Sequence, residues 1–183
     1  AGSGVILNGL DGRTNNLISD RKHGDCVLEV EFTVPQGSNS GVYLQGRYEI
    51  QVFDSFGIPD DRVAHSDCGG IYQRYVEGDG GYGYEGHAPM TNASKAPGEW
   101  QSYKIWFKAP RFDEDGKKIS NAKFIKVVHN GKTLHENVEV TGPTRAATWL
   151  DTEEALAPLM LQGDHGPVAY RKIRIIDKDF TNK

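Results

Sequence analysis

S-N-S-G-V-Y-L-Q-G-R-Y-E-I-Q-V-F-D-S, residues 38–55, is the stretch from which the fold can be read. Apolar and polar side chains alternate along it, first around Val42 and Leu44 and then from residue 48 to residue 53. This period of two predicts two β-strands with one face in a core and the other face outside it. Gly41 and Gly46 interrupt the run, and a glycine inside a strand marks a bulge or a close approach of another group.

The outward face of this stretch carries long hydrogen-bonding side chains, where a solvated strand more often carries Lys, Thr and Ser. They are Tyr43, Gln45, Arg47, Glu49 and Gln51. Such a row is suited to the floor of a groove that holds a sugar, and it is equally compatible with an exposed strand face with ordinary charges. Spacing alone does not separate the two interpretations.

Length and composition favour one β-rich domain. The chain has 183 residues, enough for one domain with a sizeable core, and its 22 glycines against 8 prolines suit strands and loops. A net charge of −4 offers no basic surface for nucleic acid. No run approaches the roughly 20 apolar residues of a membrane-spanning helix, so membrane insertion is not expected. We predict a single β-rich domain over residues 1–183, with its core at about 5–177.

The N-terminus and the two cysteines say little about the compartment in which the protein works. Ala1–Gly4 has neither a basic nor an apolar region, so it is no signal peptide and suits a processed end or a cloning remnant. Cys26 and Cys68 allow at most one disulfide. Cys26 shares a face with Leu28 and Val30, which favours a small buried side chain over a disulfide partner.

Further strands are predicted on both sides of the central stretch. They are Asp25–Pro35, Trp100–Pro110, Ala122–His129, Lys132–Val140, Leu159–Gln162 and Ala169–Ile176. A hairpin through residues 36–39 is the simplest connection into the central stretch, and Asn130–Gly131 is a strong hairpin signal. Asp151–Ala157 is the only plausible helix, because Asp151 or Thr152 can cap it and two glutamates follow in its first turn.

Residues 56–99 form a long glycine-rich segment without regular periodicity. Its aromatic residues are Tyr72, Tyr75, Tyr82 and Tyr84, with His87 beside them. Disordered segments are poor in such residues. We therefore expect a folded loop over one rim of the sandwich, whose aromatic faces either stack on sugar rings or only pack the loop down.

Several motifs resemble, in order, those of the 3-keto-disaccharide hydrolase family. They are the central stretch, D-C-G-G-I-Y at 67–72, G-E-W-Q-S-Y at 98–103, A-P-R-F-D-E-D-G-K at 109–117, H-N-G at 129–131, T-G-P-T at 141–144 and L-Q-G-D-H-G-P-V-A-Y-R-K-I-R-I at 161–175. The resemblance covers roughly residues 8–176. It implies an all-β, concanavalin- or lectin-like sandwich (jelly roll) of two antiparallel sheets, with one loop insertion at 56–99 and at most one short helix. It also implies a periplasmic or extracellular carbohydrate-active protein. An opening segment usual in the family is absent, so other domains of a larger protein could supply a first strand.

The resemblance implies cleavage of 3-keto-glycosides by general acid–base chemistry. A ketone at C3 makes the C2 proton acidic, so a base can remove it, the C1 substituent leaves, and water then adds. An acid for the leaving oxygen and a group that stabilises the enolate complete the site. The candidate catalytic residues are Glu49, Asp54, His65 and His165, with either histidine as the base. The candidate substrate-binding residues are Tyr43, Arg47, Gln51, Tyr72 and Gln162. Two histidines and a carboxylate could also hold a divalent metal ion, although their spacing is not a metal motif.

Three alternatives remain open. Glu49 and Asp54 resemble the acid pair of retaining glucanases, but residues five apart point to opposite faces of a regular strand. His165 in the turn D-H-G-P could simply cap the sandwich. The domain could also be a non-catalytic carbohydrate-binding module of a larger extracellular protein. Convergence of His65 and His165 with Glu49 would favour catalysis.

Overall fold

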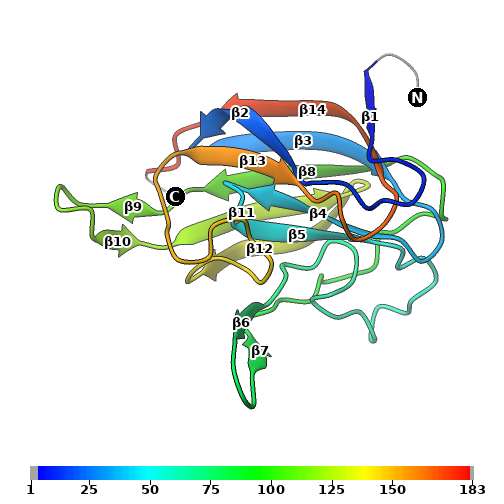
Figure 1. Ribbon diagram of the computed structural model, residues 1–183, viewed down its shortest axis with the longest axis horizontal. Helices are drawn as coiled ribbons and strands as arrows, with labels where there is room; N and C mark the ends of the chain where they lie inside the picture. The colour runs from blue at the N-terminus through cyan, green and yellow to red at the C-terminus, as the bar shows by residue number, and fades with distance from the viewer. Residues whose placement is uncertain (1–3, 182–183) are drawn as a thin grey trace.

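The computed structural model describes residues 4–181, and the strands dominate it (Figure 1). The strands are β1 (Val5–Leu7), β2 (Leu17–His23), β3 (Cys26–Thr33), β4 (Asn39–Leu44), β5 (Tyr48–Phe53), β6 (Arg74–Val76), β7 (Tyr82–Tyr84), β8 (Gln101–Lys108), β9 (Arg111–Phe112), β10 (Lys118–Ser120), β11 (Ala122–His129), β12 (Lys132–Val140), β13 (Ala157–Leu161) and β14 (Ala169–Asp177). Most of the N-terminal segment interpreted above, residues 1–3, lies outside the described residues.

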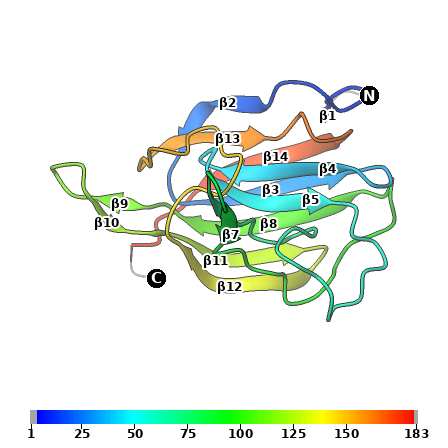
Figure 2. The same ribbon diagram turned by 60° about the horizontal axis from the view of Figure 1, so that its bottom comes forward.

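Two antiparallel sheets lie face to face (Figure 2). One has six strands in the order β1-β14-β3-β8-β11-β12, and the other has four in the order β2-β13-β4-β5. The hairpins β6–β7 and β9–β10 project from this body (Figure 1). The predicted all-β sandwich is confirmed.

The core lies between the two sheets and follows the alternation in the sequence. Leu28 and Phe32 on β3 are fully buried, and so are Val42 on β4 and Ile50 on β5. Burial of each such side chain contributes roughly 1.5–3 kcal/mol. Cys26 and Cys68 are also buried, with free thiols. The outward side chains of β4 and β5 are thereby held on a rigid support.

Two local predictions are wrong. β3 belongs to the six-stranded sheet and β4 to the four-stranded sheet, so residues 34–38 cross between sheets and make no hairpin. Asp151–Ala157 forms no helix, and β13 already begins at Ala157. Contacts with β5 and the turn before it explain why no helix forms. The Arg47 guanidinium donates to the Thr152 carbonyl at 2.5 Å, and the Tyr48 hydroxyl donates to the Glu153 carboxylate at 2.5 Å. These contacts hold the segment irregular and override its helix propensity.

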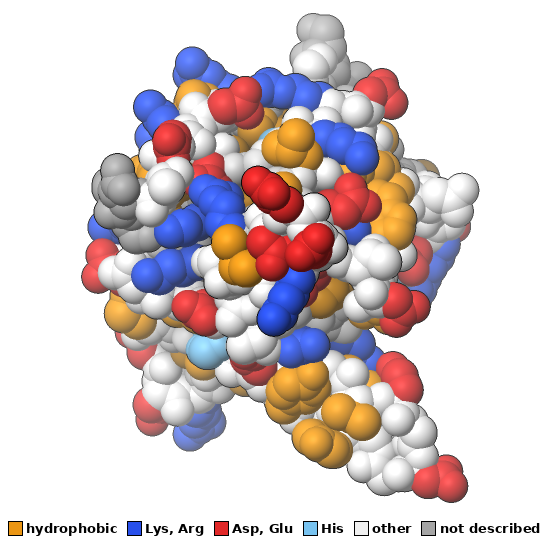
Figure 3. Space-filling view, turned by 90° about the vertical axis from the view of Figure 1, so that its left-hand side faces the viewer, with side chains coloured by type: hydrophobic (Ala, Val, Ile, Leu, Met, Phe, Trp, Pro, Cys, Tyr) orange, Lys and Arg blue, Asp and Glu red, His pale blue; other side chains and the backbone are white. Residues whose placement is uncertain are grey.

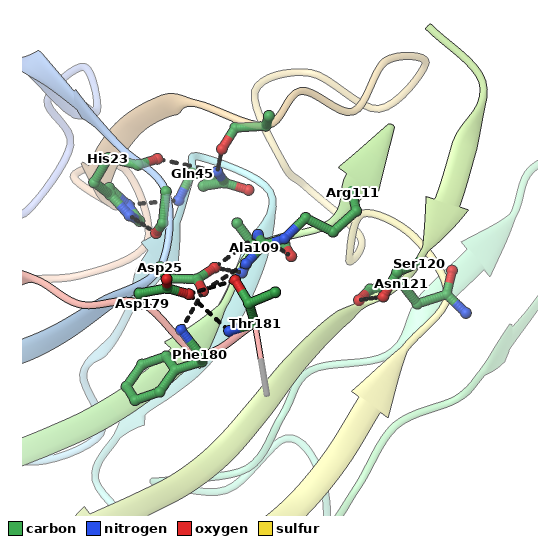
Figure 4. Close-up of polar contacts among 12 residues, drawn as sticks. His23, Asp25, Gln45, Ala109, Arg111, Ser120, Asn121, Asp179, Phe180 and Thr181 are labelled. Atoms are coloured by element: carbon green, nitrogen blue, oxygen red, sulfur yellow. Dashed lines mark hydrogen bonds and ion pairs between the residues drawn. The ribbon is translucent and has the colours of Figure 1, made fainter. Parts of the chain in front are cut away.

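A polar clamp secures the chain near its C-terminal end (Figure 4). Asp25 receives two hydrogen bonds from the Arg111 guanidinium, at 2.8 and 2.6 Å, and others from the backbone N–H groups of Ala109 and Phe180. Burial opposes ionisation of Asp25, but these hydrogen bonds together lower its pKa. The cluster therefore fixes the end of β14 to the loop before β9 as an ion pair.

The segment 56–99 is folded back against the four-stranded sheet. Its residue Ile71 forms bridges with both Ile50 and His87. The backbone N–H of Gly69 donates to the Gln51 carbonyl, and that of Tyr72 donates to the Glu49 carbonyl. This segment thus extends the sheet beyond β5 before it turns outward into the β6–β7 hairpin (Figure 1).

Candidate functional site

A polar cavity of about 400 Å³ opens on the outer face of the four-stranded sheet. It is lined by Asn39, Tyr43, Glu49, Gln51, Tyr72, Arg145, Ala146, Gln162 and His165. β4 and β5 supply its floor, because Tyr43 lies opposite Glu49 in their register. The outward row of the central stretch therefore does line a concave surface.

Gly41 makes room for the carboxylate on this floor. A Cβ atom at Gly41 would lie 2.3 Å from Oε1 of Glu49 and 2.7 Å from the Tyr43 ring. Both distances are far below van der Waals contact, so only glycine fits here. The close approach that the sequence predicted for this glycine is the approach of Glu49.

Glu49 is an uncommon carboxyl group. Its side chain is only 3% exposed although it borders the cavity. Burial raises its pKa to about 8, against the opposing effect of a hydrogen bond from Tyr43. Burial, together with the neighbouring Glu49, also raises the pKa of the Tyr43 hydroxyl well above its usual value. At neutral pH Glu49 is therefore mostly protonated and can donate a proton into the cavity.

Two side-chain amide groups line the same cavity as Glu49, and their oxygens lack hydrogen-bond partners within the described residues. Oε1 of Gln51 and Oδ1 of Asn39 are buried and have no hydrogen-bond partner among residues 4–181, while Nε2 of Gln51 donates to the Ser66 carbonyl at 3.2 Å. A buried acceptor without a partner costs about 1–3 kcal/mol. A ligand with several hydroxyl groups can remove that cost.

The rim of the cavity carries a histidine and an arginine. Nδ1 of His165 lies 2.6 Å from a carboxylate oxygen of Asp164, and the Asp164 carbonyl in turn accepts from Arg13. This contact orients the imidazole and leaves its Nε2 for other partners. On the same rim Arg145 precedes Ala146, which has a left-handed backbone with φ 64°. Such a conformation in a non-glycine residue is uncommon and costs free energy.

Arg47 has a different position from the one expected of a sugar-binding residue. Its side chain is only 1% exposed, and its guanidinium carbon lies 5.2 Å from the centroid of the Trp149 ring. The guanidinium donates hydrogen bonds to the backbone carbonyls of Gln45 and Thr152. It therefore anchors the loop that carries Arg145. Gln45 also points away from the cavity, because its side chain donates to carbonyls of His23 and Ala155 (Figure 4 shows the Gln45–His23 contact).

Two of the predicted catalytic residues do not line the cavity. The Asp54 carboxylate accepts from the backbone N–H groups of Gly37 and Phe56, so it is not paired with Glu49 as in a retaining glucanase. The His65 ring lies against the Tyr72 ring, 5.6 Å between centroids, outside the residues that line the cavity. The structure thus brings Glu49 and His165 into one cavity and leaves His65 and Asp54 beside it.

The long segment 56–99, expected as a folded loop over one rim, contributes little to the cavity. Of the segment 56–99, only Tyr72 lines the cavity. Sequence reasoning missed Asn39, Arg145 and Ala146. The motif T-G-P-T ends at Thr144, immediately before Arg145, and was the available signal for it. Within residues 4–181 no three His, Cys, Asp or Glu side chains converge on a metal-sized site.

The family match and the similar solved structures make this a carbohydrate-related protein, glycosyl-hydrolase-like or carbohydrate-binding in its architecture. A family model matches residues 2–176, and the chain belongs to that family, the 3-keto-alpha-glucoside-1,2-lyase-like domain. This confirms the family resemblance seen in the sequence. Within the described residues, no helix has the length and apolar character needed to cross a membrane.

Similar solved structures come from Parabacteroides distasonis and bear the name "putative glycosyl hydrolase". One is 28% identical with a TM-score of 0.75, over 97% of this chain and 73% of that one. A second is 19% identical with a TM-score of 0.63, over 97% and 88% of the two chains, and supports the fold alone. The comparison with curated protein sequences found no match.

Proposed function

We propose that this protein cleaves 3-keto-glycosides by elimination followed by addition of water, with Glu49 and His165 as its acid and base. The observation that carries the proposal is that both side chains line one polar cavity, one mostly protonated through burial and the other held by Asp164. The family to which the chain belongs supports the substrate class.

His165 serves as the base. With Nδ1 held by Asp164, its Nε2 removes the proton from C2 of the sugar, which the C3 ketone makes acidic. The electron pair of the C2–H bond moves into the C2–C3 bond, and the C3 oxygen becomes an enolate. Arg145 is the cation on the cavity wall that stabilises this negative charge.

Glu49 serves as the acid. The enolate re-forms the C3 ketone, the C1–C2 double bond forms, and the C1–O bond breaks as Glu49 transfers its proton to the departing oxygen. Water then adds at C1 and gives its proton to the Glu49 carboxylate, while His165 returns its proton to C2. Both residues regain their starting states, and the sum of the steps is hydrolysis.

The other residues of the cavity bind the sugar. Gln51 and Asn39 supply buried oxygens that accept from hydroxyl groups, and Gln162 and Tyr72 complete the wall. Tyr43 orients Glu49 through their hydrogen bond. We further propose, from the family, that the protein meets its glycoside in the periplasm or outside the cell.

The test is turnover of a 3-keto-glucoside by wild type and by three variants. His165→Ala and Glu49→Gln should each lower kcat by about 10²–10⁴, the usual contribution of a general acid or base. His65→Ala is the matched control, because His65 does not line the cavity, and it should stay close to wild type. Assays with and without a chelator decide whether a divalent metal takes part. Sugar binding without turnover in wild type would favour a non-catalytic binding module.

A further inference from the structure

The turn that carries His165 lies against a second irregular connection. Residues 162–168 join β13 of the four-stranded sheet to β14 of the six-stranded sheet, and residues 8–16 join β1 to β2. Because β1 pairs with β14 and β2 pairs with β13, both connections bridge the same edge of the sandwich. The segment 8–16, N-G-L-D-G-R-T-N-N, is therefore the part of the chain that supports this turn from behind.

Asn8 closes the turn through its side-chain amide. Its Nδ2 donates to the carbonyls of Gly163 and Gly166, both at 2.9 Å. Its Oδ1 accepts from the backbone N–H of Val168 at 2.8 Å. A flipped amide would place its oxygen against two carbonyls, so these partners determine the orientation of the group. Asn8 therefore ties together the backbone on both sides of His165.

The rest of the segment packs closely on the same turn. Oδ1 of Asn16 accepts from the backbone N–H of Gly163 at 3.0 Å. Gly12 has a left-handed backbone with φ 59°, and a Cβ atom there would lie 1.9 Å from the carbonyl carbon of Gly166. Only glycine fits at such a distance. The turn thus has little room to move toward the segment 8–16.

His165 depends on this support because its own side chain is little packed. The side chain is 45% exposed, and the Asp164 carboxylate that its Nδ1 contacts is 51% exposed. Asp164 belongs to the same turn. Its contact orients the ring relative to the turn, while the place of the turn relative to the cavity has to come from other contacts. Asn8 supplies such contacts.

We infer that Asn8 is a positioning residue for His165, which holds the turn so that Nε2 of His165 reaches the C2 proton of the bound sugar. Asn8 is not among the residues that line the cavity, so it acts through the backbone of the turn. This inference rests on the proposed function, because that function makes His165 the base. A displacement of a reacting group by about 1 Å can lower a rate on the order of 10²-fold.

The test is a double-mutant cycle that combines Asn8 with His165. Asn8→Ala should lower kcat for a 3-keto-glucoside about 10- to 100-fold and leave KM within about twofold, because the sugar is bound by other residues. In the His165→Ala background the same change should lower the residual kcat by less than about twofold, since no imidazole is left to position.

Asn8→Asp separates the hydrogen bonds from the shape of the side chain. One aspartate oxygen can still accept from Val168, but the other faces two carbonyls and has no proton to donate when ionised. Asn8→Asp should therefore lower kcat at pH 7 about as much as Asn8→Ala. Urea unfolding shows whether each variant is folded under the assay conditions.

Two controls change exposed side chains that do not hold the turn. Asn15→Ala is the matched control, because within residues 4–181 the exposed Asn15 side chain makes no hydrogen bond to the turn. Tyr82 lies on the β6–β7 hairpin, which projects from the body and carries hydrophobic side chains (Figure 3). It is 60% exposed and does not line the cavity. Asn15→Ala and Tyr82→Ala should both leave kcat unchanged.

The outcomes separate this inference from the proposed function. An equal fall of kcat in both backgrounds would overturn the inference, because Asn8 would then act on the whole protein and not through His165. Wild-type kcat in His165→Ala, or no turnover by wild type, would refute the proposed function. NMR of the imidazole rings then still tests the positioning. A shift in Asn8→Ala confined to His165 among the six histidines would support it, and unchanged His165 signals would overturn it.

Discussion

Replacing Glu49 by glutamine removes an ionisable group from the cavity floor and keeps its shape. Burial raises the pKa of Glu49 from an ordinary value of 4.5 to about 8. Since one pKa unit corresponds to about 1.4 kcal/mol, ionised Glu49 costs the folded state on the order of 5 kcal/mol. Such a cost is a large part of the stability of a typical domain.

The difference in proton binding between the folded and unfolded chain decides whether Glu49 stabilises or destabilises the protein at a given pH. Between pH 4.5 and about 8 the folded protein keeps a proton on Glu49 that the unfolded chain has released. In this window Glu49 therefore lowers the free energy of unfolding by about 1.4 kcal/mol for each pH unit of increase. Below pH 4.5 Glu49 is protonated in both states and does not destabilise the folded protein, and above about pH 8 its destabilising effect is fully present. Glutamine cannot ionise, so the Glu49→Gln variant should gain stability relative to wild type as the pH rises.

Urea unfolding at pH 5, 7 and 9 measures the effect. The difference in unfolding free energy between Glu49→Gln and wild type should grow by several kcal/mol from pH 5 to pH 9. Glu114→Gln is the matched control, because Glu114 lies exposed in the turn before β10, and its difference should stay constant. A constant difference for Glu49→Gln as well would show that this carboxyl is not buried in its neutral form, and would remove the physical basis for its role as an acid.

The remaining predictions use the same cavity and the core beneath it. The kcat/KM for a 3-keto-glucoside should fall as the pH rises through about 8, because ionised Glu49 has no proton to donate; a profile flat to pH 9.5 would contradict its role. Gly41→Ala should lower kcat/KM and the melting temperature together, since the added Cβ would lie 2.3 Å from Glu49; wild-type values in both measurements would refute the close approach. Burial lowers the pKa of His129 to about 3 and that of His135 to about 4, so as the pH falls from 6.5 to 4 each should reduce the unfolding free energy by about 1.4 kcal/mol per unit. Imidazole NMR titrations check this, and protonation of either ring near pH 6.5 in the folded protein would count against it.

The fold was predictable because its strands are buried on one face and the period of two is therefore strong. The alternation through Val42 and Ile50 assigns the core face correctly, and Tyr43, Glu49 and Gln51 follow as the opposite face. The same periodicity cannot say which sheet a strand joins. The connection from β3 to β4 was for that reason misread as a hairpin.

The site was predictable only where it lies on one continuous stretch. Gln45 and Gly46 have left-handed backbones, with φ of 54° and 63°, so the chain turns there and Arg47 leaves the row. Its buried guanidinium then donates a hydrogen bond to the Thr152 carbonyl in the loop before β13. Asn39 and Arg145 reach the cavity through tertiary folding, and no spacing in the sequence relates them to Glu49.

The central claim is that the C2–H bond of the sugar breaks before the glycosidic bond is cleaved. The most direct measurement is turnover of a 3-keto-glucoside in D₂O, with the released sugar analysed by NMR. The elimination mechanism predicts deuterium at C2 of the product, with both cleavage and deuterium incorporation lost in His165→Ala. Cleavage that leaves hydrogen at C2 would contradict the claim and indicate direct displacement at C1.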